Sequence, residues 1–491
     1  YYAEAAKRES DPRARALDAI RNTMIRVRGS YALGILFGDQ PGVIYAARKD
    51  SPLILGRCDG EYQGHMIASD VPAVLNYTRN VVYIDNQEIA CLTRDELHVY
   101  NIDCEEIEKP FVEIKWDAAA AEKDGYEHFM MKEIHEQPRA VRDTLSPRIK
   151  ENESGERYID LSETGLTDED FAAVSRVYLI GCGSAYHVGM AARYVLEKAA
   201  RVPCEVDLAS EFRYRDPILE ESGLVIIISQ SGETADSLAA LRLCKERGVR
   251  TLAVVNVVGS SIAREADSVI YTWAGPEIAV ASTKAYITQV EMMVLLAIDL
   301  GVKRGHLTES VASELLRQMA DIPALAEQVM ALEPAVQRFS SLYHDRQHVF
   351  YIGRGLDNAL AMEASLKLKE VSYIMSEAYA AGELKHGTIA LIEQGTLVCA
   401  LLTQEQLADK TLSNVREVKS RGAKVLIVCP EALRDRAAKD ADELWVIPDA
   451  ASDLLPLLAI IPVQLFAYYM AVSRGCDVDK PRNLAKSVTV E

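Results

Sequence analysis

Short apolar runs alternate with longer amphipathic stretches from about residue 126 to the end of the chain. Such short runs, bounded by turn residues, are typical of buried strands, and the stretches between them have the spacing of helices. Strands that alternate with helices favour a parallel sheet covered by helices, so this part is predicted to have an α/β fold. The predicted strands are residues 177–180, 224–228, 251–255, 349–352, 396–401 and 424–428.

Residues 1–116 have a different pattern. An amphipathic helix at the start is followed by β-type runs separated by Gly, Asp, Asn and Pro, which predicts an antiparallel sheet layer. Residues 117–126 combine small and charged residues without an apolar period and are predicted to be a linker. The chain does not begin with Met and has no signal-peptide pattern, so it is interpreted as part of a longer gene product.

The α/β part contains an internal repeat. The stretch RVYLIGCGSAYHVGMAARYVLE aligns with HVFYIGRGLDNALAMEASLKLK, and a second pair of similar stretches begins at Leu224 and Leu397. Both pairs have an offset of about 172 residues, so the sequence predicts two copies of one doubly wound domain. The predicted copies are residues 127–335 and 336–474, and a tail of residues 475–491 follows them.

The loop SQSGET follows the apolar run 224–228 and comes directly before a predicted helix, residues 235–246. Ligands bind beyond the carboxyl ends of parallel strands, and neutral donors at a helix N-terminus suit a phosphate group. A plain helix cap is the alternative. The second copy has Leu-Thr-Gln-Glu at residues 402–405, without the glycine, so only the first copy is predicted to bind an anion well. The candidate ligands are Ser229, Gln230, Ser231 and Thr234.

A second turn, IGCGSAYHVG, also joins a predicted strand to a helix and contains Gly-x-Gly. A dinucleotide fingerprint is a weak interpretation, because the third glycine is displaced and no convincing acidic residue ends the next strand. A tight turn that brings Ser184 toward a ligand is preferred. The stretch GPEIAVASTKAY adds Glu277, Ser282 and Thr283 ahead of another predicted helix, where a capped helix start is the alternative.

Candidate acid–base groups lie in the second copy and in the tail. Lys367 and Glu370 are three residues apart on a predicted helix and share one face, where a surface ion pair is the alternative. His386 lies in the glycine-bracketed loop YAAGELKHG, and the near-neutral pKa of histidine suits proton transfer; an exposed loop histidine is the alternative. Lys486 is a candidate for a Schiff base with a ketone, and a solvated tail lysine is the alternative.

Composition narrows the classes of partner. With 491 residues, 49% hydrophobic and 26% charged, the chain has the composition of a globular protein of several domains. Its net charge of −19 argues against nucleic acid and membrane surfaces as partners but allows a small anion at a local site. The most apolar stretch, residues 454–472, contains two prolines, a Gln and two Tyr and is interpreted as a buried helix. The nine cysteines include no C-x-x-C pair, so neither a zinc site nor a disulfide framework is indicated, and the cytoplasm is the expected compartment.

Taken together, these motifs resemble one known family. CGSAYHVG, SQSGETADSLAAL, VASTKAYITQ, SLKLKE, AYAAGELKHG and the terminal DVDKPRNLAKSVTVE resemble the glutamine–fructose-6-phosphate aminotransferase (isomerizing) family, also called glucosamine-6-phosphate synthase. MMKEIHEQP resembles the segment that opens the family's isomerase half, and residues 30–116 are similar to the latter part of its glutaminase domain. The resemblance implies two tandem sugar-isomerase (SIS) domains of doubly wound parallel α/β type, after a partial, β-rich glutaminase domain of the Ntn type.

The resemblance also implies an activity. The family converts D-fructose 6-phosphate to D-glucosamine 6-phosphate with ammonia from glutamine, the first step of hexosamine and UDP-N-acetylglucosamine biosynthesis. By resemblance, Lys486 forms the Schiff base, Glu370 moves the proton between C1 and C2, and Lys367 assists. His386 opens the sugar ring from the neighbouring subunit, which implies a homodimer, and neither a cofactor nor a metal is implied. The sugar phosphate is expected at Ser184, Ser229, Gln230, Ser231, Thr234, Val280, Ser282 and Ala485.

Two features depart from the family pattern. The family has Thr-Ser where this chain has Ser184 and Ala185, so one hydroxyl is missing from the expected phosphate site. The family's glutaminase uses an N-terminal cysteine, and no residue of this chain is assigned to that site. We therefore expect the front of the glutaminase domain to be missing and the ammonia-dependent isomerase half to remain. Glutamine is expected to be a substrate only when the missing part is present. The alternatives are an SIS-class phosphosugar isomerase or deglycase and a non-catalytic phosphosugar sensor, which would need a helix-turn-helix and a basic face.

Overall fold

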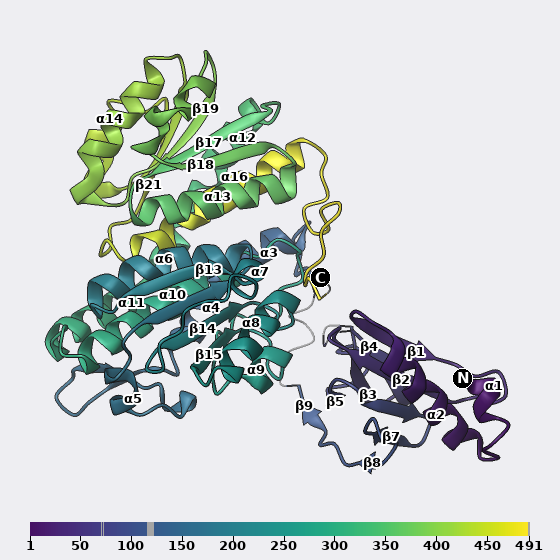
Figure 1. Ribbon diagram of the computed structural model, residues 1–491. Helices are drawn as coiled ribbons and strands as arrows, with labels where there is room; N and C mark the ends of the chain where they lie inside the picture. Colours follow the sequence, from purple (N-terminus) through teal and green to yellow (C-terminus); the bar gives the residue numbers. More distant parts are fainter. Residues whose placement is uncertain (70, 72, 115–121, 490–491) are drawn as a thin grey trace. The chain divides into compact units, whose positions relative to one another are not determined.

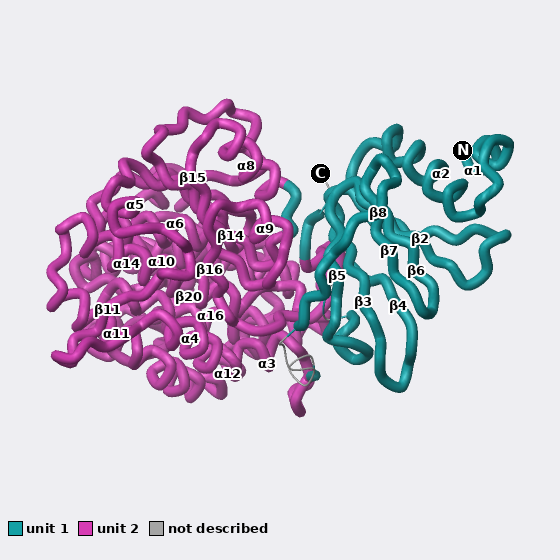
Figure 2. The backbone as a smooth tube through the Cα atoms, turned by 90° about the horizontal axis from the view of Figure 1, so that it is seen from below, with its two compact units in different colours: residues 1–122, 233–235, 487–491 teal, residues 123–232, 236–486 magenta. Residues whose placement is uncertain are grey.

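The computed structural model of the chain describes residues 1–69, 71, 73–114 and 122–489 (Figure 1). The linker predicted at residues 117–126 lies outside the described residues up to position 121. The chain divides into two compact units (Figure 2). Unit 1 contains Tyr1–Glu122, Glu233–Ala235 and the segment that begins at Ser487, and unit 2 contains Lys123–Gly232 and Asp236–Lys486. The domain boundaries given above stay predictions.

Two helices begin unit 1. The single helix expected at the start is wrong, because the chain forms α1 (Tyr2–Ala5) and α2 (Pro12–Arg26) with a break between them. The side chain of Asp11 accepts hydrogen bonds from the backbone N–H groups of Arg13 and Ala14, so it caps α2 and fixes where that helix begins.

The β-type runs of unit 1 form antiparallel strands, as expected. The strands are β1 (Tyr31–Ile35), β2 (Ile44–Lys49), β3 (Ile54–Asp59), β4 (Gln63–Ala68), β5 (Asn80–Tyr83), β6 (Ile89–Leu92), β7 (Leu97–Tyr100), β8 (Glu106–Ile107) and β9 (Val112–Glu113). They form two sheets rather than one layer, in the orders β1-β2-β6-β7-β8 and β4-β3-β5-β9. Alternate residues of β2 face opposite ways: Tyr45 packs with Leu17 of α2, and Ala46 packs with Leu55 of β3.

Unit 2 contains two parallel sheets. The strands of the first sheet are β12 (Val177–Gly181), β13 (Cys204–Leu208), β14 (Leu224–Ser229), β15 (Arg250–Val255) and β16 (Ser268–Tyr271). Their order is β13-β12-β14-β15-β16, and every neighbouring pair is parallel. In this doubly wound order the switch point lies between β12 and β14, where ligands bind in such folds. We call this sheet and its helices the first module. The helices are α6 (Ser184–Ala199), α7 (Ala209–Phe212), α8 (Ala235–Glu246), α9 (Ser261–Glu265) and α10 (Lys284–Lys303).

The second sheet repeats the first. Its strands are β17 (His348–Gly353), β18 (Met375–Ala380), β19 (Leu397–Leu401), β20 (Lys424–Pro430) and β21 (Glu443–Ile447). They follow the same order, β18-β17-β19-β20-β21, all parallel. This sheet and its helices are the second module, and the prediction of two copies is confirmed. The helices are α12 (Glu333–Tyr343), α13 (Leu356–Ser372), α14 (Ala408–Lys419), α15 (Arg434–Ala437) and α16 (Leu455–Ser473).

One hydrophobic core joins the two modules. Leu296 of α10, Leu360 of α13 and Phe466 of α16 all belong to it. α10 and α16 are long and apolar enough to cross a membrane, but 94% of the most apolar window of each is buried inside the protein, so we interpret both as core helices. The remaining elements of unit 2 are α3 (Phe129–His135), α4 (Gln137–Leu145), α5 (Asp168–Ala172), α11 (Glu309–Val329) and the hairpin of β10 (Ile149–Glu151) and β11 (Arg157–Ile159).

Candidate active site

The loop after β14 is shaped by a glycine. Gly232 has a φ of +67°, and a Cβ placed there would lie 2.0 Å from the Oγ of Ser260, so only glycine fits. The backbone N–H of Gly232 donates to the Oγ of Ser229 at 3.0 Å. The backbone N–H of Asn256, which follows β15, donates to the carbonyl of Gln230 at 3.1 Å. These contacts fix the loop at the carboxyl end of β14, beside the switch point.

Ser184 begins α6 on the other side of the switch point. Gly183 precedes it with a φ of +56°, so the Gly-x-Gly motif forms the tight turn that the sequence favours over a dinucleotide site. The Oγ of Ser184 donates to the Oε1 of Glu363 at 2.8 Å, and the Nδ1 of His187 lies 2.8 Å from the Oε2 of Glu363. Glu363 is on α13, so this predicted phosphate ligand of the first module contacts a carboxylate of the second.

Lys367 joins the predicted base to that carboxylate. Its Nζ lies 2.5 Å from the Oε2 of Glu370 and 3.5 Å from the Oε1 of Glu363, and its side chain is only 1% exposed, so the pair is not a surface ion pair. Burial alone would lower the pKa of Lys367, but Glu370 and Glu363 outweigh it and raise that pKa above its usual value. Burial would likewise raise the pKa of Glu363, but Lys367 and His187 hold it below the usual value. The three α13 side chains therefore share a buried, charged cluster.

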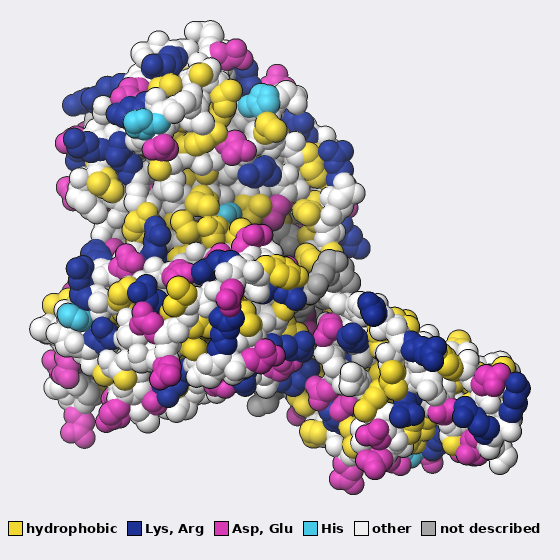
Figure 3. Space-filling view, in the orientation of Figure 1, with side chains coloured by type: hydrophobic (Ala, Val, Ile, Leu, Met, Phe, Trp, Pro, Cys, Tyr) yellow, Lys and Arg dark blue, Asp and Glu magenta, His cyan; other side chains and the backbone are white. Residues whose placement is uncertain are grey.

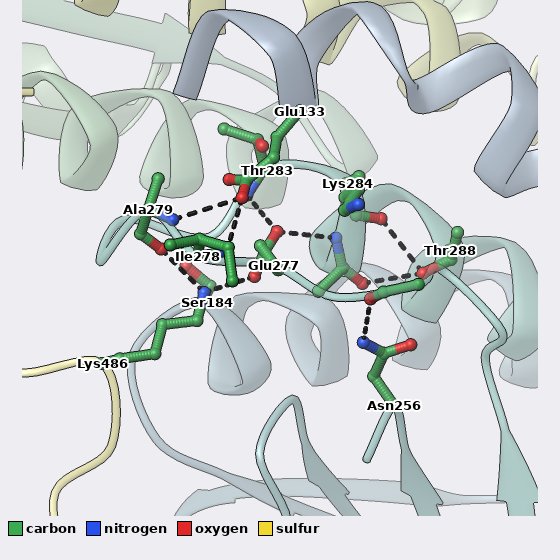
Figure 4. Close-up of polar contacts among 12 residues, drawn as sticks. Glu133, Ser184, Asn256, Glu277, Ile278, Ala279, Thr283, Lys284, Thr288 and Lys486 are labelled. Atoms are coloured by element: carbon green, nitrogen blue, oxygen red, sulfur yellow. Dashed lines mark hydrogen bonds and ion pairs between the residues drawn. The ribbon is translucent and has the colours of Figure 1, made fainter. Parts of the chain in front are cut away.

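Lys486 is held by two acceptors. Its Nζ donates to the Oε2 of Glu277 at 2.6 Å and to the carbonyl of Ala279 at 2.9 Å (Figure 4). The other carboxylate oxygen of Glu277 accepts from the backbone N–H groups of Thr283 and Ala285 at 2.9 and 3.1 Å. Burial alone would raise the pKa of Glu277, but the Lys486 ammonium and these hydrogen bonds hold it below its usual value. Lys486 is therefore not a solvated tail lysine.

The tail that carries Lys486 is anchored by Asp479. The Asp479 carboxylate accepts hydrogen bonds from the backbone N–H groups of Phe129 and Met130 at 2.9 Å each, so it caps α3. The carbonyl of Asp479 accepts from the N–H of Val280, a predicted ligand-lining residue, at 3.0 Å. The tail, α3 and the segment of residues 277–280 are thus bonded to one another.

The other predicted site residues lie in loops or next to the ends of helices. His386 ends a 3₁₀ turn (Glu383–His386) and is exposed, and no hydrogen bond of its ring is found within the part of the chain that the structure describes. Ser231 lies in the loop after β14 and is half-buried, and Ser282 is half-buried two residues before α10. Ala485 is exposed beside Lys486, and Thr234 directly precedes α8 in the segment that groups with unit 1.

A charged residue of α3 was missed by the sequence reasoning. The Oε1 of Glu133 accepts hydrogen bonds from the backbone N–H groups of Ile278 and Ala279, at 2.5 and 3.2 Å. The motif MMKEIHEQP had marked this helix only as a family segment. A charged pair inside an otherwise apolar helix start, Lys132 and Glu133, is the signal that could have found it, because both side chains are buried.

Asp357 closes the switch point of the second module. Its Oδ2 accepts from the backbone N–H groups of Thr403 and Gln404 at 2.9 and 3.4 Å, and its Oδ1 accepts from the Thr403 hydroxyl at 2.5 Å. Burial raises the pKa of Asp357 to about 6, although these hydrogen bonds oppose the rise. In the second module, the loop that corresponds to SQSG therefore donates its hydrogen bonds to a carboxylate of the protein itself. The repeat alignment, which pairs Asp357 with Ala185, carries this signal.

The surroundings of the site are mixed in character. In the space-filling view, hydrophobic side chains gather between the two modules, and acidic and basic side chains are interspersed over the rest of the drawn face (Figure 3). Among the described residues, no group of three or more His, Cys, Asp or Glu side chains is placed to hold a metal ion.

Comparison with known proteins supplies the family. A family model for the SIS domain matches residues 170–299 and 341–474, which fall in the first and second modules. A curated glutamine–fructose-6-phosphate aminotransferase (isomerizing) of Caldanaerobacter subterraneus subsp. tengcongensis is 51% identical over 475 residues, covering 97% of this chain and 77% of that protein. The same-named protein of Clostridium acetobutylicum is 52% identical with the same coverage. This chain belongs to the glutamine–fructose-6-phosphate aminotransferase family.

Solved structures agree with membership of the aminotransferase family. The C-terminal domain of glucosamine-fructose-6-phosphate aminotransferase from Francisella tularensis is 38% identical, with a TM-score of 0.70, and covers 73% of this chain and 100% of that chain. Glucosamine-6-phosphate deaminase from Thermotoga maritima is 25% identical, with a TM-score of 0.58, covering 73% of this chain and 99% of that chain. The resemblance read from the motifs is confirmed, but the comparisons do not support the expectation of a missing glutaminase front.

Proposed function

We propose that this chain forms D-glucosamine 6-phosphate from D-fructose 6-phosphate and an amino donor. The observation that carries the proposal is the placement of Lys486, whose amino group is held by Glu277 and Ala279 at the first module. The printed names of relatives about 50% identical to this chain support the same reaction. No other function class considered above, neither a phosphosugar isomerase or deglycase nor a sensor, has a comparable observation in its favour.

The reaction needs an amine that attacks a ketone and a base near C1 and C2. After loss of a proton, the Nζ of Lys486 attacks the C2 carbonyl of the open-chain ketose, and water leaves to give an iminium. Ammonia then takes the place of the lysine nitrogen at C2. Glu370 accepts a proton from C1 and returns one to C2, which converts the ketose imine into an amino aldose. In sum, ammonia and fructose 6-phosphate give glucosamine 6-phosphate and water.

The assisting groups follow from the same cluster. Lys367 lies against Glu370 and stabilises negative charge that develops on the sugar oxygens during the proton shift. We place the phosphate at the switch point, where neutral hydroxyl, amide and backbone donors meet a helix N-terminus. The proposed phosphate and sugar contacts are Ser184, Ser229, Gln230, Ser231, Thr234, Val280, Ser282 and Ala485.

The finer features of the family are also proposed for this chain. His386 is exposed in the described structure, which suits a residue that opens the sugar ring in the site of a neighbouring subunit, so we propose a homodimer. Glutamine is the proposed source of ammonia. The cytoplasm is the proposed compartment. Each of these rests on the family resemblance together with the residues named here.

The proposal is tested by turnover. The purified chain is incubated with fructose 6-phosphate and either ammonium or glutamine, and glucosamine 6-phosphate is measured by mass spectrometry. In parallel, borohydride is added with the sugar phosphate, and we expect the reduced sugar adduct on the peptide that contains Lys486. Interconversion of hexose phosphates without amino sugar would favour the isomerase alternative. Sugar binding without any turnover would favour the sensor.

A further inference from the structure

Glu133 lies directly behind the segment that holds Lys486. It is on α3 and is 2% exposed, and it has no role in the reaction proposed above. Figure 4 shows its side chain directed at residues Ile278 and Ala279. The segment of residues 277–279 therefore donates backbone hydrogen bonds to Glu133 and accepts hydrogen bonds from Lys486.

The two sets of bonds meet at Ala279 and at the neighbouring residues Glu277 and Ile278. Glu133 accepts from the N–H of Ala279, and the carbonyl of Ala279 accepts from the Nζ of Lys486. Glu133 also accepts from the N–H of Ile278, the residue next to Glu277. A shift of the Glu133 side chain therefore moves both acceptors of Lys486. Asp479 also bonds the start of α3 to the tail that carries Lys486.

A purely structural role would not need a carboxyl group here. The Oε2 of Glu133 is buried and has no hydrogen-bond partner among the described residues. An amide could accept the same two backbone N–H groups, so the second oxygen and the charge are unexplained by backbone anchoring alone. Burying a carboxyl group without a partner for one oxygen costs free energy and favours its neutral form, so Glu133 becomes charged only at alkaline pH.

The charges around Glu133 come from several elements. Burial, and then Glu277, raise the pKa of Glu133 to about 8, while Lys486 of the tail and Lys284 of α10 oppose the rise. α16, which also packs against α3, carries only Tyr468 and Tyr469 as titratable groups. The other groups nearby are Lys132 and His135 of α3, Glu136 directly after it, and the charged side chains of α4, which are largely exposed. His135 lies 2.9 Å from Glu333, and Lys132 lies 3.6 Å from Glu136.

We propose that Glu133 is a positioning residue for the aminotransferase reaction: its carboxyl group fixes residues 277–279 and thereby the two acceptors that hold the Nζ of Lys486. The proposal rests on the proposed function, because it matters to catalysis only if Lys486 is the reacting amine. Glu133 itself touches neither the phosphate loop nor the α13 cluster in any contact described here.

The decisive measurement is the reactivity of Lys486 as a function of pH. Trace acetylation with acetic anhydride, read by mass spectrometry, reports the fraction of free amine, and the exposed Lys369 serves as the reference in the same sample. In the parent protein, Glu133 is ionised at alkaline pH, and it interacts with the charge of Lys486. In Glu133→Gln the carboxylate charge is absent, so we expect the Lys486 profile to move to lower pH by at least about 0.5 unit. Glu291→Gln is the matched control, because Glu291 is also a buried glutamate with a carboxylate oxygen that lacks a hydrogen bond among the described residues, but it lies on α10.

Steady-state kinetics provide a second test of the role of Glu133. Glu133→Ala loses both backbone bonds, so we expect kcat for glucosamine 6-phosphate to fall about 10- to 100-fold while KM for the sugar phosphate changes less than about threefold. Glu133→Gln keeps one acceptor oxygen, so we expect it to recover most of that kcat near pH 7 but with an altered pH profile. If Glu133→Ala does not fold, the glutamine variant decides the question alone.

The outcomes separate the two proposals. If the parent protein makes no amino sugar, the proposed function fails, and the acetylation profile still tests the link between Glu133 and Lys486. A Lys486 profile that is the same in the parent protein, Glu133→Gln and Glu291→Gln would overturn the inference. A shift in Glu133→Gln that Glu291→Gln does not share would support it.

Discussion

Lys486 and Glu277 are separated by 209 positions in the sequence, and their side chains meet at 2.6 Å. The carboxylate is fully buried, while about a quarter of the lysine side chain is exposed. The pair therefore places the amine that we propose to react where solvent can reach it, and its counter-charge inside the protein. Because one partner is buried, removing the other leaves an uncompensated charge, which is costly.

Replacing Glu277 with Gln should weaken the hold on Lys486. We expect kcat to fall about 100-fold, because the amine is no longer oriented by a charge. The pKa of Glu277 lies below its usual value, so its contribution to stability is present above about pH 4.5 and is lost as the pH falls through the folded-state value. The unfolding midpoint of Glu277→Gln should thus differ from the parent protein at pH 7 and converge with it in acid. Glu265→Gln, which alters a surface pair with Arg242, should leave kcat unchanged.

Replacing Glu370 with Gln tests the proposed base. General base catalysis contributes about 100- to 10,000-fold, so we expect a loss of kcat in that range. The fold should persist, because Lys367 keeps Glu363 as a partner. Imine trapping on Lys486 should remain, since it precedes the proton shift. Lys369→Ala, one residue away on the exposed side of α13, is the matched control, and normal turnover in Glu370→Gln would contradict the assignment.

Gly232→Ala should disrupt the phosphate loop. The new Cβ would collide with Ser260, whereas Gly248, with a similar φ of +72°, has nothing within 4 Å of its Cβ position. Gly248→Ala therefore measures the cost of backbone strain alone, about 1 kcal/mol. We expect Gly232→Ala to lower stability further and to raise KM for the sugar phosphate at least about tenfold, because the loop must move. Equal effects in the two variants would show that the collision is relieved without cost to binding.

Asp357 predicts a pH dependence of stability. Burial raises the pKa of Asp357 to about 6 in the folded state, so its contribution is complete below about pH 4 and is lost as the pH rises through 6. Asn can accept the same backbone N–H groups and donate to Thr403, and it does not titrate. The stability of the parent protein relative to Asp357→Asn should therefore decline between pH 4 and 6. Unfolding is measured by the fluorescence of the buried Trp445. Asp357→Ala should be destabilised at every pH, by about 1–3 kcal/mol for each unpaired N–H group.

His386 predicts complementation between subunits. If His386 serves the site of a neighbour, mixing His386→Ala chains with Lys486→Ala chains should restore one working site in each mixed dimer. Each variant alone should be inactive in ring opening or imine formation. Activity in the mixture, measured as glucosamine 6-phosphate formed per dimer after dissociation and reassociation, checks the assignment. Mixtures that remain inactive while forming dimers would place His386 in its own subunit's site.

The central strands could be predicted because they are buried on both faces. The strand predicted at 224–228 corresponds to β14, which is one residue longer. The strands predicted at 251–255 and 349–352 are one and two residues longer in the structure. The edge strands β13 and β18 were not predicted, because Glu and Asp interrupt their apolar residues and only one side of each strand pairs with the sheet. Burial of both faces leaves a continuous apolar run, and an edge does not.

Candidate site residues could be named from the sequence where the residue type is unusual, but their contacts could not. The hydroxyl-rich loop and the Lys367–Glu370 spacing pointed to their location directly. The partners Glu277 and Glu133 could not be paired with their targets, because both contacts join segments more than 100 residues apart. Asp357 was visible in the repeat alignment as a carboxylate opposite Ala185, but its role depends on the two N–H groups it meets in the folded chain.

The anchoring of the tail by Asp479 bears on how the protein is made. Chains emerge from the ribosome in order, and domains fold as they emerge. Asp479 and Lys486 follow α3 and the segment that Lys486 contacts by 350 and 209 positions, so they are synthesised well after them. The amine can reach its carboxylate only after residue 486 has been added and the chain has folded back. A nascent chain that stalls before residue 479 therefore exposes a helix without its cap and a buried carboxylate without its cation.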